Sequence, residues 1–394
     1  MKRLLLLLTL FSICALSKGI EVQSHLSSEA KISLLSIGEG EEIYALYGHT
    51  AIRVHDSTMQ IDLVFNYGTF DFNQPHFIWN FIQGRTDYVL SVDAFSMSIV
   101  SCMVQNRTLK EQILNLTPKE RDALWNALLK NIEPSNRKYR YNFLYNNCST
   151  KPKSIIEQSL DGYLHYTDKE EHTTFRKLLR PYIKNSPWTD FGINLGLGNT
   201  IDKEISFEEE MFLPDYLHNA FQTAQIIDLS HTARPLVSSE RIWVTKEEIS
   251  KPHHTLLPLH AGYILLAITL LITLVEWKRK VLFRLWDLLF YCVYAFCGTI
   301  IYILTFSSEL PGTSPNWNAL WLMPFHIIVP ILIFTMRGKM ILKIYHSCVI
   351  VCILLSYIVR FYGIQNIPLA ADGFVLALMV RSLSYLRYIR TEKE

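Results

Sequence analysis

The chain has 394 residues, of which 49% are hydrophobic and only 19% are charged. Typical soluble domains carry about 25% charged residues, so the composition excludes a disordered chain and indicates a membrane-embedded part. The 38 basic and 36 acidic residues leave a formal net charge of +2, which argues against a protein that binds nucleic acid. The seven cysteines are too few and too scattered for a disulfide scaffold.

The N-terminal segment 1–17 has the pattern of a cleavable signal peptide. Basic Lys2 and Arg3 precede an apolar run that extends to Leu16, and small residues follow. An uncleaved membrane anchor is the alternative. Residues 18–250 mix polar and apolar residues without repeats, so we expect one exported domain with a sizeable core.

The segment 251–394 is strongly hydrophobic and predicts an all-α bundle of five transmembrane helices. A helix needs about 20 apolar residues to cross a bilayer. The stretches that approach this length are 256–275, 285–306, 318–336, 344–360 and 366–382. The last stretch has the weakest pattern, because it contains Pro368 and Asp372.

Basic residues alternate between the connections of these five stretches. Lys and Arg are frequent in the first and third connections and in the C-terminal tail, whereas the second connection, 307–317, has none and the fourth has only Arg360. The positive-inside rule gives this alternation when an exported domain precedes five crossings. We therefore expect a multi-pass membrane protein whose domain 18–250 lies outside the cytoplasm.

Cys148 has a sequence context that suits a nucleophile. The stretch 154–160 has a helical pattern and Pro152 suits a first helical turn, so Cys148 is expected at or just before a helix N-terminus. The helix dipole and the free N–H groups at that position stabilise an anion, which lowers the pKa of a thiol. A buried structural cysteine is the alternative.

His49 opens a predicted strand and is the expected base for Cys148. If the apolar faces of this strand and of the strand 61–65 lie on the same side of a hairpin, His49 shares its face with Asp62 and Asn66. A carboxylate on one ring nitrogen would leave the other nitrogen free to take the thiol proton. We expect Asp62 in this orienting role, with Asn66 as second choice, although a solvated strand face would also explain Asp62.

Asn147 is a candidate for holding a negatively charged oxygen in the transition state, together with the backbone N–H of Cys148. A turn or cap residue is the simpler interpretation of Asn147. The sequence has no zinc-protease spacing, P-loop, dinucleotide fingerprint or EF-hand, so we expect neither a metal nor a cofactor. It also lacks the G-x-S-x-G elbow of serine hydrolases.

Three segments look like the signatures of the Lnb family of Bacteroides-type bacteria. They are 47–54 with Tyr-Gly-His-Thr-Ala-Ile-Arg-Val, 65–72 with Phe-Asn-Tyr-Gly-Thr-Phe-Asp-Phe, and 142–150 with Asn-Cys-Ser-Thr at its end. A histidine on a strand followed by a cysteine at a helix start also resembles the permuted papain (NlpC/P60) architecture that lecithin–retinol acyltransferase-like enzymes share. The resemblance implies an α+β permuted papain-like domain followed by five transmembrane helices.

The resemblance further implies a lipoprotein N-acyltransferase in the bacterial inner membrane, with its catalytic domain in the periplasm. Such an enzyme takes an acyl chain from a phospholipid, holds it as a thioester on Cys148 and passes it to the α-amino group of a diacylglyceryl-cysteine lipoprotein. Its partners are then the bilayer, the phospholipid donor and the diacylated lipoprotein acceptor. A membrane-anchored cysteine peptidase or amidase acting on the cell wall and a non-catalytic membrane assembly protein are the alternatives.

Two further features could serve such a reaction. Arg53 could contact the phosphate of the donor, although a cross-strand partner explains it equally well. The aromatic residues between 70 and 81 could hold acyl chains, but core packing is the preferred interpretation. These residues are Phe70, Phe72, Phe77, Trp79 and Phe81.

Overall fold

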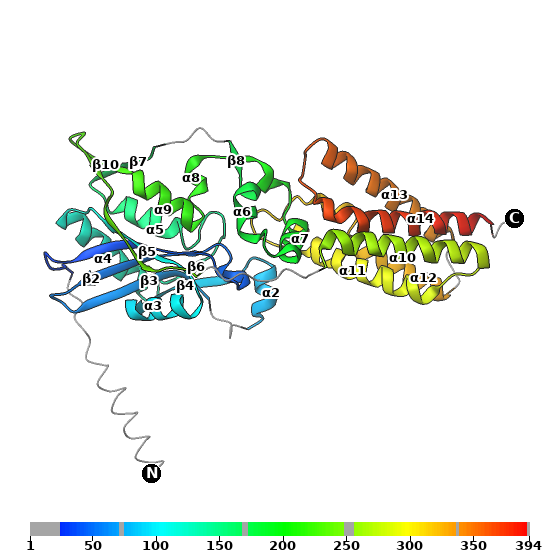
Figure 1. Ribbon diagram of the computed structural model, residues 1–394, viewed down its shortest axis with the longest axis horizontal. Coiled ribbons are helices and arrows are strands. Elements are labelled where there is room, and N and C mark those ends of the chain that lie inside the picture. Colours follow the sequence, from blue (N-terminus) through cyan, green and yellow to red (C-terminus); the bar gives the residue numbers. More distant parts are fainter. Residues whose placement is uncertain (1–23, 71–74, 168–171, 248–255, 336–338, 392–394) are drawn as a thin grey trace, which may run out of the picture.

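The computed structural model describes residues 24–70, 75–167, 172–247, 256–335 and 339–391 (Figure 1). The predicted signal peptide and the predicted boundary at residue 250 lie outside these residues. The described chain forms a mixed α/β domain that is followed by a bundle of long apolar helices.

A seven-stranded sheet organises the first domain, and its neighbouring strands are all antiparallel. In spatial order the strands are β12 (Val237–Val244), β5 (Leu109–Leu114), β1 (Lys31–Ile37), β2 (His49–Asp56), β3 (Ile61–Thr69), β4 (Asp87–Ala94) and β6 (Lys138–Arg140). Strands β2 and β3 form the predicted hairpin, in which Ile52 lies opposite Phe65. Their apolar residues therefore share one face, as the alternation in the sequence indicates.

Helices cover both faces of this sheet. Helices α4 (Pro118–Ile132), α5 (Thr150–Gln158) and α9 (Pro214–Thr223) pack against the face that carries Ile52 and Phe65. Helix α3 (Phe95–Val104) covers the opposite face, where Cys102 is buried. Helix α4 begins at Pro118, because Thr117 and Glu120 form a capping box there.

Short elements complete the domain. They are η1 (Ile43–Ala45), α2 (Phe77–Ile82), β7 (Gly162–His165), β8 (Thr173–Thr174), α6 (Phe175–Ile183), α7 (Pro187–Gly196), η2 (Asn199–Asp202), β9 (Glu204–Ile205), α8 (Phe207–Glu210), β10 (Gln225–Asp228) and β11 (Ala233–Pro235). Strands β7, β10 and β11 form a small second sheet, and β8 pairs with β9.

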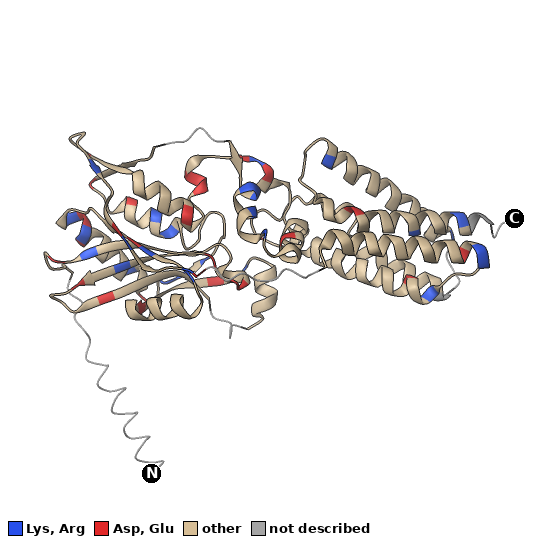
Figure 2. Cartoon of the chain, in the orientation of Figure 1, with Lys and Arg blue, Asp and Glu red and all other residues tan. Residues whose placement is uncertain are grey.

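Within the described residues, the bundle contains four long helices, α10 (Pro258–Arg279), α11 (Arg284–Phe306), α13 (Lys339–Phe361) and α14 (Asp372–Thr391). The first three, and a fourth stretch from Leu369 to Tyr388 that includes most of α14, are long and apolar enough to cross a membrane. The charged residues of the bundle lie mostly towards its two ends (Figure 2). Asp372, the acidic residue within the last predicted span, is paired with Arg360 of α13, 2.6 Å away.

The prediction of one continuous helix over 318–336 is wrong. The chain forms η3 (Trp317–Leu320), η4 (Pro324–Ile327) and then α12 (Ile328–Thr335). Pro324 has no N–H with which to continue a helix. The backbone of Met323 also packs so closely on Gly298 of α11 that a Cβ at Gly298 would lie 2.4 Å from the Met323 carbonyl carbon. This contact between distant segments is not visible in a hydropathy pattern.

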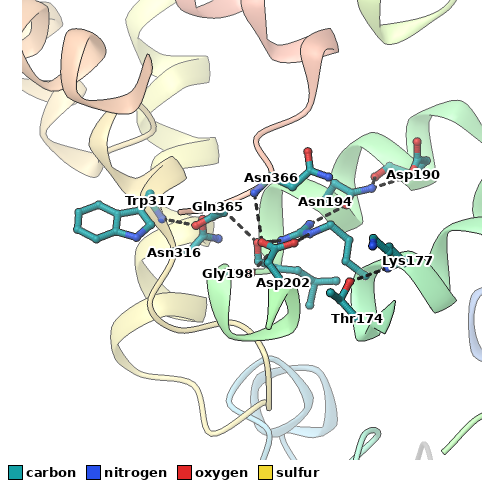
Figure 3. A network of polar contacts seen from close by, with 12 residues as sticks. Thr174, Lys177, Asp190, Asn194, Gly198, Asp202, Asn316, Trp317, Gln365 and Asn366 are labelled. Carbon is teal, nitrogen blue, oxygen red and sulfur yellow. Dashed lines mark hydrogen bonds and ion pairs between the residues drawn. The ribbon is translucent and has the colours of Figure 1, made fainter. Parts of the chain in front are cut away.

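A polar network joins the two domains (Figure 3). The buried Arg176 of α6 donates to Asp202 over 2.6 Å, and Asp202 accepts the backbone N–H of Asn366. Gln365 donates to the carbonyl oxygen of Leu197 and to the side chain of Asn316. The segment from α6 to η2 is therefore fastened to the connections at one end of the bundle.

Helix α2 is fastened to the same end of the bundle. Ser308 donates its hydroxyl to the Ile82 carbonyl over 2.7 Å, and the Glu309 N–H donates to the Gln83 carbonyl over 2.8 Å. Arg85 also pairs with the Glu309 carboxylate at 2.9 Å. The connection 307–317, which carries no Lys or Arg, thus lies on the side of the α/β domain, where the positive-inside rule places it.

Candidate active site

Cys148 directly precedes Ser149, the N-cap residue of α5, which is the position that the sequence predicts. Asn147 holds this end of the helix, since its Oδ1 accepts the backbone N–H groups of Ser149 and Thr150 at 2.8 and 2.9 Å. Its side-chain nitrogen donates to two backbone carbonyls. The Asn147 amide is fully occupied as a cap, so its side chain is not free to stabilise an oxyanion.

His49 opens β2 and hydrogen-bonds with the side chain of Cys148. The two residues meet because the start of α5 is fixed to β2. The hydroxyls of Thr50 and Ser149, neighbours of the pair in the sequence, are buried and lie 3.0 Å apart. A strand residue and a helix-start residue far apart in the chain are thereby brought together.

Two glycines make room for this contact. Gly48 has φ +80, and a Cβ there would lie 2.7 Å from the Ile37 carbonyl oxygen. Gly68 has φ +95, and a Cβ there would lie 3.2 Å from the Tyr141 ring and 3.5 Å from Cβ of Cys148. Glycine adopts such backbone angles at no steric cost, so both positions allow close approach where other residues would be strained.

Cys148 and His49 shift each other's pKa. Burial lowers the pKa of His49, but its hydrogen bond and charge interaction with Cys148 outweigh burial, so the pKa lies above the usual 6.5. Burial raises the pKa of Cys148, but His49, a backbone hydrogen bond with Thr50 and the Ser149 hydroxyl outweigh it, so the pKa lies below the usual 9.0. Both shifts favour a thiolate–imidazolium pair, the reactive form of a cysteine nucleophile.

Asn66 is the residue that orients the His49 ring. Its Oδ1 lies 3.2 Å from Nε2 of His49, and its Nδ2 donates to the Asp93 carboxylate at 3.1 Å. Because the amide nitrogen faces a carboxylate, the amide oxygen faces the ring and accepts a proton from Nε2. Nδ1 of His49 is therefore the nitrogen left for Cys148.

Asp62 does not lie beside His49, so the expected position of this carboxylate is wrong. The strand register places Asp62 opposite His55, and its carboxylate binds Arg53 at 2.7 and 3.0 Å. Arg53 is buried, also binds Glu111, and lies over the Phe95 ring. The cross-strand interpretation of Arg53 therefore holds, and its guanidinium is not free to contact a phosphate.

Replacing Asn66 by alanine is expected to lower the rate of any reaction that uses the Cys148–His49 pair about tenfold, which is less than the roughly 10²–10⁴-fold that a positioned general acid–base itself contributes. The reason is that His49 loses the acceptor that fixes its tautomer. Steady-state rates measured across a range of pH would show the loss together with a changed pH profile. Asp93→Asn, which keeps the side chain's shape and an oxygen acceptor for Asn66, is expected to cause a smaller loss. Equal losses in both variants would contradict an orienting role.

The backbone N–H of Cys148 donates no hydrogen bond within the part of the chain that the structure describes. It is therefore available to an oxyanion that forms next to the sulfur. Tyr141 hydrogen-bonds with Cys148, and burial together with the charge of Cys148 raises the pKa of Tyr141 well above its usual 10.0. The tyrosine stays protonated near neutral pH, so its O–H is a second donor beside the sulfur.

The site residues predicted from the sequence do not include Tyr141, Asp93 or Arg107, which the structure places at the site. Tyr141 stands in the same segment as Cys148, and that proximity is the one signal that could have identified it. Arg107 is 8% exposed and donates to the carbonyl of Gly38 at 2.9 Å, while its Nη2 has no hydrogen-bond partner among the described residues. Its positive charge attracts the Cys148 thiolate and opposes protonation of His49.

Two family models match the chain. The Lnb N-terminal periplasmic domain matches residues 23–181, and the Lnb transmembrane domain matches residues 250–393. The chain belongs to the Lnb family. The first match includes both members of the Cys148–His49 pair of this Lnb protein, and the second includes its four long helices. No curated protein and no solved structure matches the chain.

Proposed function

We propose that this protein is a lipoprotein N-acyltransferase of the bacterial inner membrane. The observation that carries the proposal is the Cys148–His49 pair, built at a helix N-terminus in a domain that is fastened to membrane-spanning helices. An activated thiol is suited to acyl transfer through a covalent intermediate. Its attachment to the bilayer favours a lipid substrate over the soluble peptide of a cell-wall peptidase or amidase.

In the first half-reaction the Cys148 thiolate attacks an ester carbonyl carbon of a phospholipid. The S–C bond forms and the ester C–O bond breaks. Imidazolium His49 gives its proton to the departing oxygen, so the products are a thioester and a lysophospholipid. The Cys148 N–H and the Tyr141 hydroxyl donate to the carbonyl oxygen while it carries negative charge.

In the second half-reaction the α-amino nitrogen of a diacylglyceryl-cysteine lipoprotein attacks the thioester carbonyl. The N–C bond forms, the C–S bond breaks, and neutral His49 takes the proton from the amine. The thiolate–imidazolium pair is thereby restored. The chemistry needs no metal or cofactor, because sulfur and imidazole carry every bond change and proton.

The finer features of the fold belong to the same proposal. A histidine on β2 that precedes a cysteine at the start of α5 supports a permuted papain-like domain. Five crossings are supported by the path of the chain, because the connections 307–317 and 362–368 both contact the α/β domain. Helix α13 begins at the end of the bundle far from the α/β domain and ends on the side of that domain. The chain therefore has to cross once before α13, and the broken segment from η3 to α12 supplies that crossing.

The decisive experiment is to trap the acyl group on Cys148. Purified full-length protein is mixed with phosphatidylethanolamine vesicles without lipoprotein, and its intact mass is measured. We expect a mass gain of one fatty-acyl group that maps to the Cys148 peptide and disappears with hydroxylamine, which cleaves thioesters.

Mass spectrometry of lipoprotein N-termini in a strain deficient in N-acylation separates the acyltransferase from a peptidase. The absence of any adduct, together with unrestored N-acylation, would overturn the proposal.

A further inference from the structure

Helix α2 exposes apolar side chains instead of burying them. None of its residues is buried, and Ile78, Trp79 and Phe81 are 73%, 49% and 47% exposed. Ile43 and Tyr44 of η1 are exposed as well, and the Tyr44 ring contacts Phe70, which also contacts α2. The expected core packing of the aromatic stretch is therefore wrong for α2, and Phe72 lies outside the described residues. Contiguous exposed apolar groups of this kind mark a binding surface.

The position of α2 indicates what covers this surface. The helix is held by Ser308 and Glu309, which directly follow the last turn of the membrane helix α11. Figure 1 accordingly shows α2 at the edge of the α/β domain that faces the bundle. An apolar, aromatic helix at the end of a membrane span lies at the level of the lipid headgroups and upper acyl chains.

A continuous series of aromatic rings leads from α2 to the thiol. Phe81 stacks on Phe77 and Phe77 stacks on Phe70, with ring centroids 6.0 and 5.9 Å apart. Phe70 contacts Tyr88 at 5.4 Å, and Tyr88 stacks on Tyr141 at 4.1 Å. Tyr141 is the residue that hydrogen-bonds with Cys148. The series begins on the exposed helix α2, and only its last two rings carry a hydroxyl group.

We propose that α2 and η1 form the surface on which one acyl chain of the donor phospholipid leaves the outer leaflet, and that the ring series holds this chain while its ester reaches Cys148. The inference rests on the proposed function and adds the binding site of the acyl chain. An acyl chain needs an apolar path, and an ester carbonyl needs hydrogen-bond donors. The rings from Phe81 to Phe70 supply the path, and the hydroxyl of Tyr141 supplies a donor beside the sulfur.

The test compares two acyl donors on full-length protein. Ile78→Asp places a charge on the exposed face of α2, and Leu229→Asp is the matched control, because Leu229 is 88% exposed on the turn between β10 and β11. Acylation of Cys148 is timed by intact mass with dipalmitoyl phosphatidylethanolamine vesicles and with water-soluble 4-nitrophenyl acetate. We expect Ile78→Asp to lower the ratio of vesicle rate to acetate rate about tenfold, equivalent to about 1.4 kcal/mol, and Leu229→Asp to leave the ratio unchanged. An unchanged ratio for Ile78→Asp would overturn the inference.

A second measurement does not depend on catalysis. The full-length Cys148→Ala variant is placed in vesicles that contain phosphatidylethanolamine with a photoreactive diazirine in one acyl chain, and the cross-linked peptides are mapped after illumination. We expect cross-links to α2 and to the segment around Phe70. Their absence, with cross-links confined to the membrane helices, would contradict the acyl-chain site. Cross-links on α2 of the Cys148→Ala variant, combined with no acylation of Cys148 in the wild-type protein, would instead reject the proposed function and keep the lipid-binding surface.

Discussion

Cells that carry Cys148→Ala as their only copy of this protein are expected to show no N-acylation of lipoproteins. The expected loss is complete, because in the proposed mechanism the acyl group is attached to the thiol sulfur and alanine offers no substitute. The measurement is mass spectrometry of lipoprotein N-termini, with the amount of membrane-inserted protein determined in parallel. Restored N-acylation by the alanine variant would remove Cys148 from the mechanism.

Cys102→Ala is the matched control for this experiment. Cys102 is also a free thiol, but it is buried in the core under α3, on the opposite face of the sheet from α5. The substitution removes one sulfur from a packed core, which affects stability and not the chemistry of acyl transfer. We therefore expect Cys102→Ala to retain N-acylation in proportion to the amount of folded protein.

His49→Gln is expected to lower the rate of acyl transfer by about 10²–10⁴-fold, the usual contribution of a positioned general acid–base. In the proposed mechanism His49 stabilises the Cys148 thiolate and also supplies the proton for the leaving oxygen, so its loss affects both. The pKa of Cys148 lies below 9.0 in the native protein because the partner of the thiol outweighs burial. Loss of that partner removes the largest contribution that opposes burial, so the pKa rises and the thiolate fraction at neutral pH falls.

The rate of Cys148 alkylation by iodoacetamide, measured against pH, reports this shift directly. We expect the inflection to move to higher pH in His49→Gln. His55→Gln is the matched control, because His55 lies on the same strand and face but opposite Asp62, away from the thiol. An unchanged inflection in His49→Gln would show that the histidine does not activate Cys148.

The choice between Asp62 and Asn66 as the residue that orients His49 shows what can be predicted from the sequence and what cannot. Alternation along two strands tells which residues share a face, and it correctly placed His49, Asp62 and Asn66 on one face of the hairpin. It does not tell the register, because shifting the pairing by two residues leaves every side chain on the same face. The register puts Asp62 opposite His55, and Asn66 is the residue that reaches His49.

Local and distant interactions explain the other outcomes. The start of α4 was predictable because Thr117 and Glu120 interact with the backbone within one turn. The position of Cys148 before α5 was predictable for the same reason, since helix starts have local signals. The break at Met323 depends on its contact with Gly298, and the place of α2 beside the bundle depends on its hydrogen bond with Ser308. Neither contact leaves a periodic trace in the sequence.

The junction between the domains has a consequence for the choice of acceptor. The Arg85–Glu309 ion pair and the Gln365–Leu197 hydrogen bond connect two segments of the α/β domain to the bundle, so in the proposed enzyme they fix the distance of the thiol from the bilayer. For the proposed transfer, this distance limits which amines can reach the thiol. The amine of a lipid-anchored cysteine stays within reach of a thiol at that distance, whereas lysines farther along a secreted protein rarely do. The enzyme can then accept lipoproteins of unrelated sequence and still modify only their first residue.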